Sequence, residues 1–516
     1  MLSLALGLTV AAGVVIAGPR PDRAQGAPAP TLNWKPCVDV RSLTCATLVV
    51  PLDRTRPNGP TIGIGVTKVA ARQSSRRIGS LLVNPGGPGA SGQTFARQLV
   101  RGLSPALLDR FDIIGWDPRG VGSSRPVRCL ASTADYDRFY AADPVPDSPA
   151  ERQVLIDEAE RFARGCLARN GADGLRFVGT SDVVDDVEDI RRALGEEQIS
   201  YFGFSYGTLL GARYADRYPG HVRAFVLDGM LDPTADTANR AIHQARGFDQ
   251  ALNGFLAVCG DVSCGWIKKG ETPAAAFDRL AHEIDVTPLR ATNRRTASVR
   301  LLGPGEFTTA VIAALYSRDA GWPLLRRGLT SAAKGDGAPL LRLFDAYADR
   351  SSSGYGNIAD ANAAVNCADV PSPRGADGFD QLADRLAGLS PRFGRLAAYS
   401  SLVCGFWPVP VTGSLVPVRA VGSLPILVIG TTRDPATPIE WARSVVKQLA
   451  NATLLTFDSD GHTAYLTGNV CIRKYTDEYL LTKKLPPGNT VCSSKRGHGI
   501  WTTTVVSLRF RWDPGR

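Results

Sequence analysis

A serine between two glycines follows an apolar run and precedes an amphipathic one. Residues 199–203 (Ile-Ser-Tyr-Phe-Gly) predict a buried strand, Ser205 lies in Gly203-Phe-Ser-Tyr-Gly207, and a helix is expected over 206–218. Glycines suit a turn so tight that side chains would collide with neighbouring backbone. A serine held there, above a strand end and at the positive end of a helix, is a candidate nucleophile. The pattern predicts acyl transfer through a covalent intermediate.

Such a serine needs a histidine as base, and the chain has five. His462 lies on a loop that leaves the apolar run 453–457, where a mobile imidazole could reach Ser205. The other four come too early in the chain, lie in a helix-rich stretch or fall beyond the last expected strand: His221, His243, His282 and His498.

The acid that orients the histidine should follow the preceding strand. Asp434 is the only carboxylate in the loop after the apolar run 425–429, and we expect it to hold the tautomer of His462 and to stabilise the imidazolium. Asp458 and Asp460 share the histidine loop and are expected to be turn residues.

A glycine-rich segment at 82–92 (Leu-Val-Asn-Pro-Gly-Gly-Pro-Gly-Ala-Ser-Gly) follows another apolar run. Its backbone N–H groups can approach a substrate closely, so we assign an oxyanion hole to the N–H groups of Gly87 and Tyr206. A phosphate-binding loop is disfavoured, because the segment lacks both a Gly-Lys-Ser/Thr ending and the Gly-x-Gly-x-x-Gly spacing.

Short apolar runs alternate with helical patterns over much of the chain. Strands are expected at 61–69, 80–84, 111–115, 199–203, 224–228, 426–429 and 453–457. Apolar residues at three- and four-residue spacing predict a helix over 182–194. The alternation of strands and helices predicts a mostly parallel sheet. The nucleophile, the acid and the histidine also follow one another in this sequence along the chain, which predicts an α/β-hydrolase fold.

The alternation breaks in one long stretch, which suggests an inserted domain. We expect a first part of the core at 31–231, a helical cap at 232–422, a C-terminal part of the core at 423–492 and a tail at 493–516. A smaller insertion is expected at about 125–177, carrying Cys129 and Cys166.

The chain begins with an apolar, uncharged run at 2–17, followed by a Pro/Ala-rich stretch. We interpret 1–30 as a signal peptide and linker, although no Lys or Arg precedes the run; the alternative is a retained anchor. Ten cysteines favour export to an oxidising compartment, either secretion or the cell envelope, and disulfides over zinc. Because neighbours close short loops inside one expected unit, the predicted pairs are Cys37–Cys45, Cys129–Cys166, Cys259–Cys264, Cys367–Cys404 and Cys471–Cys492.

The composition is that of a globular protein, with 44% hydrophobic and 21% charged residues. The net charge is +10, but arginines are spread along the chain and no helix-turn-helix, zinc-finger or aromatic pattern accompanies them. Nucleic acid is therefore not expected as a partner.

Taken together, these segments resemble the tripeptidyl-aminopeptidase-like serine peptidases, exported bacterial α/β-hydrolases related to prolyl aminopeptidases. The resemblance covers about 34–492 and is carried by residues 84–89, 116–123, 201–208, 226–229, 434–438 and 461–463 and by the two late cysteines. It implies release of short peptides, often tripeptides, from the free N-terminus of peptide or protein substrates, without cofactor or metal. It leaves the oligomeric state open.

A peptidase that selects a free N-terminus must pair a charged amine with a carboxylate. Because Asp434 is committed to His462, the expected candidates lie in the cap: Asp369, beside Cys367, and Glu306, at a helix start. Turn formation and helix capping are the alternative roles of these two acids. The alternative functions are a secreted carboxylesterase or lipase, an endopeptidase of the same fold, and a non-catalytic envelope binding protein.

Overall fold

The computed structural model describes residues 30–494 except 39, 41–42, 262–263 and 293–297. The N-terminal segment 1–29, most of the expected tail and His498 lie outside the described residues. No helix in the described ranges is both long and apolar enough to span a bilayer.

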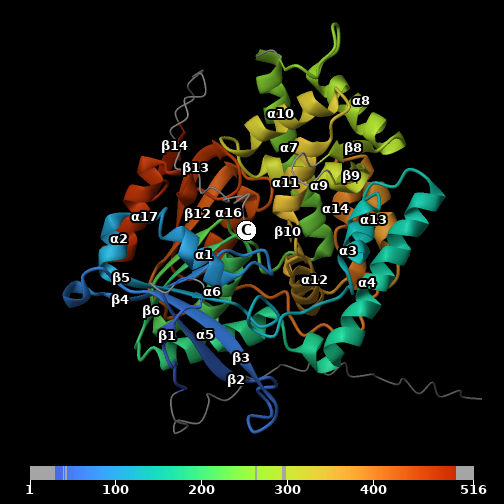
Figure 1. Cartoon of the computed structure of the whole chain (residues 1–516). Coiled ribbons are helices and arrows are strands. Elements are labelled where there is room, and N and C mark those ends of the chain that lie inside the picture. Colours follow the sequence, from blue (N-terminus) through green and yellow to red (C-terminus); the bar gives the residue numbers. More distant parts are fainter. Residues whose placement is uncertain (1–29, 39, 41–42, 262–263, 293–297, 495–516) are drawn as a thin grey trace, which may run out of the picture.

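A ten-stranded sheet runs through the described part of the chain in the order β1-β2-β3-β5-β4-β6-β7-β12-β13-β14 (Figure 1). Its strands are β1 (Lys35–Pro36), β2 (Thr44–Pro51), β3 (Thr61–Val69), β4 (Gly79–Asn84), β5 (Phe111–Trp116), β6 (Ile199–Phe204), β7 (Val222–Asp228), β12 (Ile426–Arg433), β13 (Ala452–Asp460) and β14 (Val491–Ser493). From β5 to β14 neighbouring strands are parallel, whereas β1, β2 and β3 pair antiparallel. The carboxyl ends of β6, β7, β12 and β13 therefore meet at one edge of the sheet.

Helices cover both faces of the sheet, which explains why the central strands are apolar throughout. One face packs against α5 (Thr180–Ala193), α6 (Tyr206–Arg217) and α16 (Ile439–Gln448). The other packs against α1 (Gly92–Leu99), α2 (Pro105–Arg110) and α17 (Val470–Thr482). Short 3-10 turns are at η1 (Ser74–Arg76), η2 (Pro219–His221) and η3 (Tyr465–Thr467).

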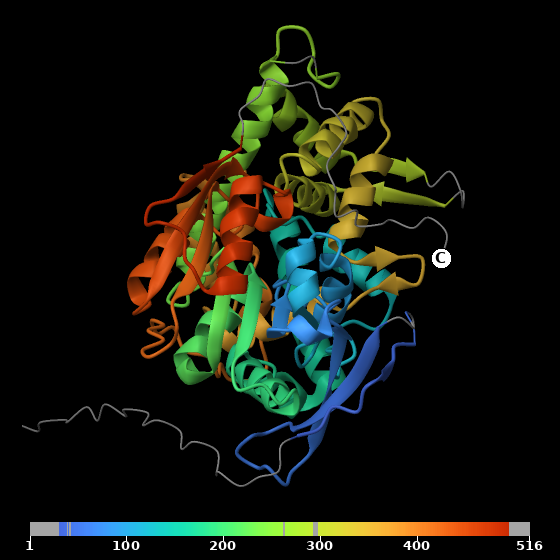
Figure 2. The ribbon, with the colours of Figure 1, turned by 90° about the vertical axis from the view of Figure 1, so that its left-hand side faces the viewer.

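A helical region lies between β7 and β12 in the chain and covers the carboxyl edge of the sheet (Figure 2). Its helices, called the cap helices below, are α7 (Thr237–Asp261), α8 (Pro273–Val286), α9 (Pro304–Leu315), α10 (Gly321–Ala332), α11 (Ala338–Tyr347), α12 (Ile358–Asp369), α13 (Asp377–Ala387), α14 (Gly394–Tyr399) and α15 (Leu402–Gly405). Two hairpins accompany them, β8–β9 (Leu289–Thr292, Val299–Leu302) and β10–β11 (Arg350–Ser351, Gly354–Tyr355). Helices α7 to α11 bury a hydrophobic core of their own.

Two further helices, α3 (Thr133–Ala141) and α4 (Pro149–Arg176), follow β5 and pack on the cap helices. The Tyr136 hydroxyl donates to the buried carboxylate of Asp360 on α12, at 2.7 and 2.8 Å from its two oxygens. Arg152 forms an ion pair with Asp380 on α13. This smaller insertion is thus joined to the larger one.

All ten cysteines are paired, in the five combinations expected from their neighbouring positions: Cys37–Cys45, Cys129–Cys166, Cys259–Cys264, Cys367–Cys404 and Cys471–Cys492. Each disulfide joins cysteines at most 37 residues apart in the chain, for example between α12 and α15 and between α17 and β14. The disulfides therefore stabilise local units, and the contacts between units depend on packing and polar networks.

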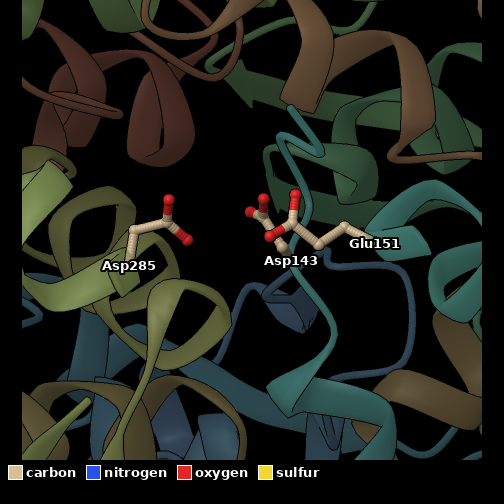
Figure 3. Close-up of side chains that lie close together, drawn as sticks. All are labelled: Asp143, Glu151 and Asp285. Carbon is tan, nitrogen blue, oxygen red and sulfur yellow. The ribbon is translucent and has the colours of Figure 1, made fainter. Parts of the chain in front are cut away.

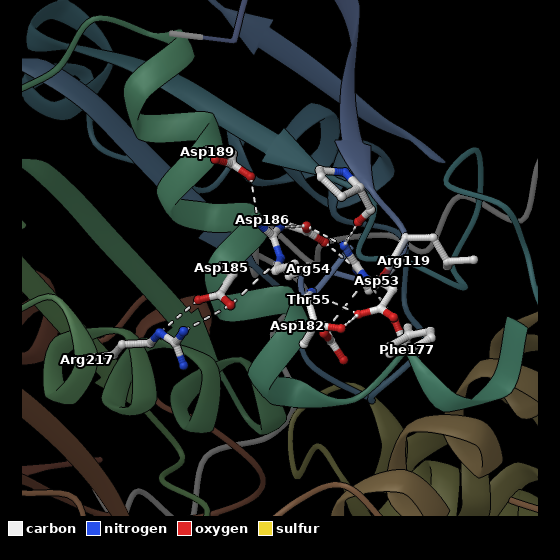
Figure 4. A network of polar contacts seen from close by, with 12 residues as sticks. Asp53, Arg54, Thr55, Arg119, Phe177, Asp182, Asp185, Asp186, Asp189 and Arg217 are labelled. Atoms are coloured by element: carbon white, nitrogen blue, oxygen red, sulfur yellow. Dashed lines mark hydrogen bonds and ion pairs between the residues drawn. The ribbon is translucent and has the colours of Figure 1, made fainter. Parts of the chain in front are cut away.

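One such network surrounds Arg119, whose side chain is 1% exposed (Figure 4). Its guanidinium binds Asp186 on α5 through two hydrogen bonds of 2.7 and 2.8 Å. It also donates to the carbonyl oxygens of Leu52, Phe177 and Pro51, at 2.9, 3.0 and 3.2 Å. One planar cation thus joins the end of β2, the end of the small insertion and a core helix, which gives the Trp-Asp-Pro-Arg segment at 116–119 a structural role.

Candidate active site

Ser205 occupies the sharp turn between β6 and α6. Its φ of 54° and ψ of −128° lie in a region that residues other than glycine rarely adopt, at a cost of about 1–3 kcal/mol. The flanking glycines are required by space: a Cβ on Gly203 would lie 2.4 Å from the carbonyl oxygen of Gly207, and one on Gly207 would lie 2.7 Å from that of Asn84. Strain at a half-buried serine in such a turn is typical of a nucleophile held for reaction.

His462 and Asp434 meet at the ends of β13 and β12. Nδ1 of His462 lies 2.9 Å from both carboxylate oxygens of Asp434. Asp434 is 2% exposed and also accepts from the backbone N–H groups of Ala436, Thr437 and Thr463, at 2.9, 2.8 and 3.1 Å. Because a carboxylate only accepts hydrogen bonds, Nδ1 carries a proton and Nε2 is the nitrogen that can act as a base.

The electrostatic surroundings favour proton uptake by His462. Burial by itself lowers the pKa of the imidazole, but the charge and hydrogen bond of Asp434, with a smaller contribution from Asp228, outweigh burial and raise it. Nε2 is buried and has no hydrogen-bond partner among the described residues. A base with a raised pKa and a free nitrogen is suited to accept a proton from a nucleophile.

The turn after β7 contacts both Ser205 and His462. The N–H of Ser205 donates to the carbonyl oxygen of Asp228 at 3.0 Å. The next residue, Gly229, is so close to the imidazole that a Cβ there would lie 3.3 Å from Cε1 of His462. The nucleophile and the base are thus supported by two consecutive residues.

The glycine-rich loop after β4 packs on the nucleophile turn. A Cβ on Gly86 would lie 2.8 Å from the backbone nitrogen of Tyr206 and 2.9 Å from Cβ of Ser205. The side chain of Asn84 shapes this loop by accepting from the N–H of Gly86 at 2.9 Å. Gly87 follows with φ of +107°, and Tyr206 begins α6, where first-turn N–H groups have no acceptor within the helix. The loop thus lies against the nucleophile turn, and the oxyanion hole of Gly87 and Tyr206 stays a prediction.

Thr437 was not singled out from the sequence, although it lies within the segment 434–438. Its hydroxyl donates to Oδ2 of Asp434 at 3.0 Å and lies 3.2 Å from Nδ1 of His462. The position three residues after the acid, where a turn brings a side chain back, is the feature that could have indicated it.

Tyr316, which lies between the cap helices α9 and α10, was also not predicted as part of the site. The N–H of His462 donates to the carbonyl oxygen of Tyr316 at 2.8 Å, and Ser317 forms a β-bridge with Gly461. The sequence offers no indication of this contact, because it joins segments nearly 150 residues apart.

The two acids expected to bind a substrate amine are placed differently. Glu306 lies at the start of α9, where its carboxylate accepts from the N–H of Gly303 at 3.1 Å in a capping box. The helix has 12 residues, so at 1.5 Å per residue about 18 Å separates its start from Tyr316 and the site. This geometry supports the alternative role of Glu306 as a helix cap and offers no support for a contact with substrate.

Asp369 lies closer to the nucleophile but is already bound. Its exposed fraction is 8%, and both its oxygens accept from Thr180, one from the N–H at 2.8 Å and one from the hydroxyl. The hydroxyl of Thr180 also lies 2.7 Å from that of Tyr206, so Asp369 is connected to the nucleophile helix. This geometry supports anchoring of α5 and offers no support for amine binding by Asp369.

Three carboxylates that are not part of the triad form an acidic cluster (Figure 3). Asp143, Glu151 and Asp285 each offer an oxygen within 4.8 Å of the others, and all are half-buried. Burial raises the pKa of Asp143 to about 6, with further increases from the neighbouring acids. Because Glu151 already caps α4 through Ser148, we assign no metal to this cluster.

Comparison with known proteins gives two family matches and several full-length relatives. Residues 79–266 match the family described as alpha/beta hydrolase fold, and residues 390–492 match the TAP-like protein family. A serine protease named Hip1 from Mycobacterium tuberculosis is 35% identical over 505 residues, covering 95% of this chain and 96% of that protein. Carboxylesterase B from the same species is 35% identical over 489 residues, covering 91% of each chain. Tripeptidyl aminopeptidase from Streptomyces lividans is 30% identical over 499 residues, covering 94% of this chain and 89% of that protein.

Proposed function

The chain belongs to the TAP-like family of α/β-hydrolases, and we propose that it is a serine exopeptidase that releases short peptides from free N-termini through an acyl-enzyme on Ser205. The observation that carries the proposal is the hydrogen-bonded pair of Asp434 and His462 beside the strained turn of Ser205. Two of the full-length relatives are named as peptidases, which favours peptides as substrates. The five disulfides favour a place outside the cytoplasm.

The reaction follows from the positions of these groups. Nε2 of His462 takes the hydroxyl proton of Ser205 while Oγ attacks the peptide carbonyl, and the N–H groups of Gly87 and Tyr206 stabilise the oxyanion. The imidazolium, stabilised by Asp434, then gives its proton to the departing amine. Water attacks the acyl-enzyme with His462 again as base, which releases the short peptide and restores Ser205.

The first test is the nucleophile. Ser205→Ala should abolish both hydrolysis and covalent labelling by a fluorophosphonate, while the circular dichroism spectrum stays that of the wild type. Labelling of undiminished intensity in the variant would remove Ser205 from the proposal.

The second test separates exopeptidase from endopeptidase and esterase. Chromogenic tripeptides with free and N-acetylated amines, longer peptides and simple esters are compared at equal concentration. The proposal requires that acetylation reduce turnover steeply, because a peptidase that reads the N-terminus must recognise its charge. Equal cleavage of free and acetylated peptides would favour an endopeptidase.

A carboxylesterase is the second candidate, favoured by the 35% identity to the relative of that name. The same triad hydrolyses esters, and the two functions differ in whether the site binds a peptide main chain. Rapid hydrolysis of simple esters without cleavage of any peptide in the panel would establish this alternative.

A further inference from the structure

Asp228 is a fully buried carboxylate that the reaction described above does not use. It is the last residue of β7 and is 0% exposed. Its carboxylate accepts from the N–H of Ala464, at 2.9 and 3.0 Å from the two oxygens, and from the N–H of Tyr465 at 2.9 Å. Both donors follow His462 closely in the chain, so the carboxylate fixes the loop that carries the base.

The backbone of the same residue fixes the nucleophile. The carbonyl oxygen of Asp228 accepts from the N–H of Ser205 at 3.0 Å, directly after the register pair of Phe204 and Asp228 between β6 and β7. One residue therefore holds the serine turn through its main chain and the histidine loop through its side chain.

We infer that Asp228 is a positioning residue that sets the separation of Ser205 and His462 and whose negative charge stabilises the imidazolium formed during the reaction. The inference rests on the proposed function, because it assigns Asp228 a role in the chemistry of that same site.

The partners of Asp228 are those of a charged carboxylate. All the hydrogen-bond partners of its oxygens given above are N–H donors, and a protonated carboxyl would need an acceptor as well. Its pKa is raised to about 7, because burial, with a contribution from Asp434, outweighs the two N–H groups and His462, which lower it; the carboxylate is therefore charged above about pH 7. The charged groups that face it are His462 and Asp434, so two buried carboxylates flank one imidazole.

A residue with only a structural role would be equally buried, so the test needs a measurement that follows charge. Asp228→Asn and Asp228→Ser remove the charge and keep an oxygen acceptor. Asp232→Asn is the matched control: Asp232 is 6% exposed, and its carboxylate accepts from Thr234 and Gln448 instead.

The expected result is a kcat reduced by up to about a hundredfold with little change in KM, since a small displacement of reacting groups is enough to cause such a loss. The acid limb of the pH–rate profile should move to lower pH, because His462 loses a negative neighbour, while Asp232→Asn keeps the wild-type profile. Wild-type kcat and acid limb in the Asp228 variants, or an equal shift in the control, would overturn the inference.

If neither variant gives the wild-type circular dichroism spectrum, Asp434→Asn decides the question. With that carboxylate neutral, burial alone would bring the pKa of His462 below its ordinary value of 6.5. Because Asp228 and His462 interact, labelled histidine in this variant should follow two titration steps in NMR, its own and that of Asp228. A single step contradicts the inference. Activity in Ser205→Ala would reject the proposed function, whereas an inactive Ser205→Ala beside fully active Asp228 variants would reject only this inference.

Discussion

The ring of Tyr316 stands edge-on to the imidazole of His462, with ring centroids 5.1 Å apart and planes at 82°. Since the backbone of Tyr316 also accepts from the N–H of His462, a residue of the cap region restrains the base of the core twice. The cap helices therefore contribute to the orientation of the imidazole as well as covering the site.

Removing the ring of Tyr316 should reduce catalysis without abolishing it. An aromatic pair is worth about 0.5–1.5 kcal/mol, so kcat/KM of Tyr316→Leu should fall roughly two- to tenfold. Tyr316→Phe keeps the edge-on ring and should remain close to the wild type on the same chromogenic peptide. Equal losses in both variants would show that the ring contact does not matter.

The activity should depend on pH through His462. A protonated imidazole cannot accept the proton of Ser205, so kcat/KM is lost as the pH falls through the pKa of His462. Because that pKa is raised, the acid limb should lie above 6.5, the ordinary value. Asp434→Asn removes the group mainly responsible for the increase and should move the limb to lower pH. A limb below the ordinary value in the wild type would contradict this account.

Much of the core could be predicted from the sequence, because its signals are local. The expected strand at 61–69 coincides with β3, and the expected helix at 182–194 lies within two residues of α5. The family match to the alpha/beta hydrolase fold confirms the predicted fold class. The parallel strands were recognisable because burial on both faces leaves continuous apolar runs.

Strand β2 was not predicted, because it lacks the continuous apolar run of the parallel strands. Ala46, Leu48 and Val50 are buried while the residues between them are exposed, a two-residue alternation typical of a strand with one solvated face. Tyr316 and Asp228 were missed as parts of the site because their roles depend on contacts between distant segments. Glu306 illustrates a related limit: an acid at a helix start has the same sequence pattern whether it binds substrate or caps the helix.

The hydroxyl of Thr437 should matter for the rate more than for substrate binding. It donates to Oδ2 of Asp434 and lies beside Nδ1 of His462, so Thr437→Val removes one of the donors that hold this oxygen. We expect kcat to fall by about tenfold, the effect of one lost hydrogen bond of roughly 1.5 kcal/mol to a charged group, with KM nearly unchanged. Thr437→Ser retains the hydroxyl and should recover most of the rate in steady-state measurements. A serine variant as slow as the valine variant would point to packing instead.

The Arg119 network should govern global stability. Arg119→Met would leave the fully buried carboxylate of Asp186 with Arg54 as its remaining cationic partner and would remove one donor from each of three backbone carbonyls. Breaking a buried ion pair in this way costs about 3–5 kcal/mol, which should appear as a lower midpoint in urea unfolding.

The surface pair of Arg164 and Glu160 provides the control, and Arg164→Met should change the free energy of unfolding by less than about 0.5 kcal/mol. Arg119→Lys keeps a positive charge beside Asp186 but cannot form the bidentate bond, so it should recover only part of the loss. An Arg119→Met variant with the urea midpoint of the wild type would mean that Arg54 alone satisfies Asp186 and that the carbonyl contacts add nothing.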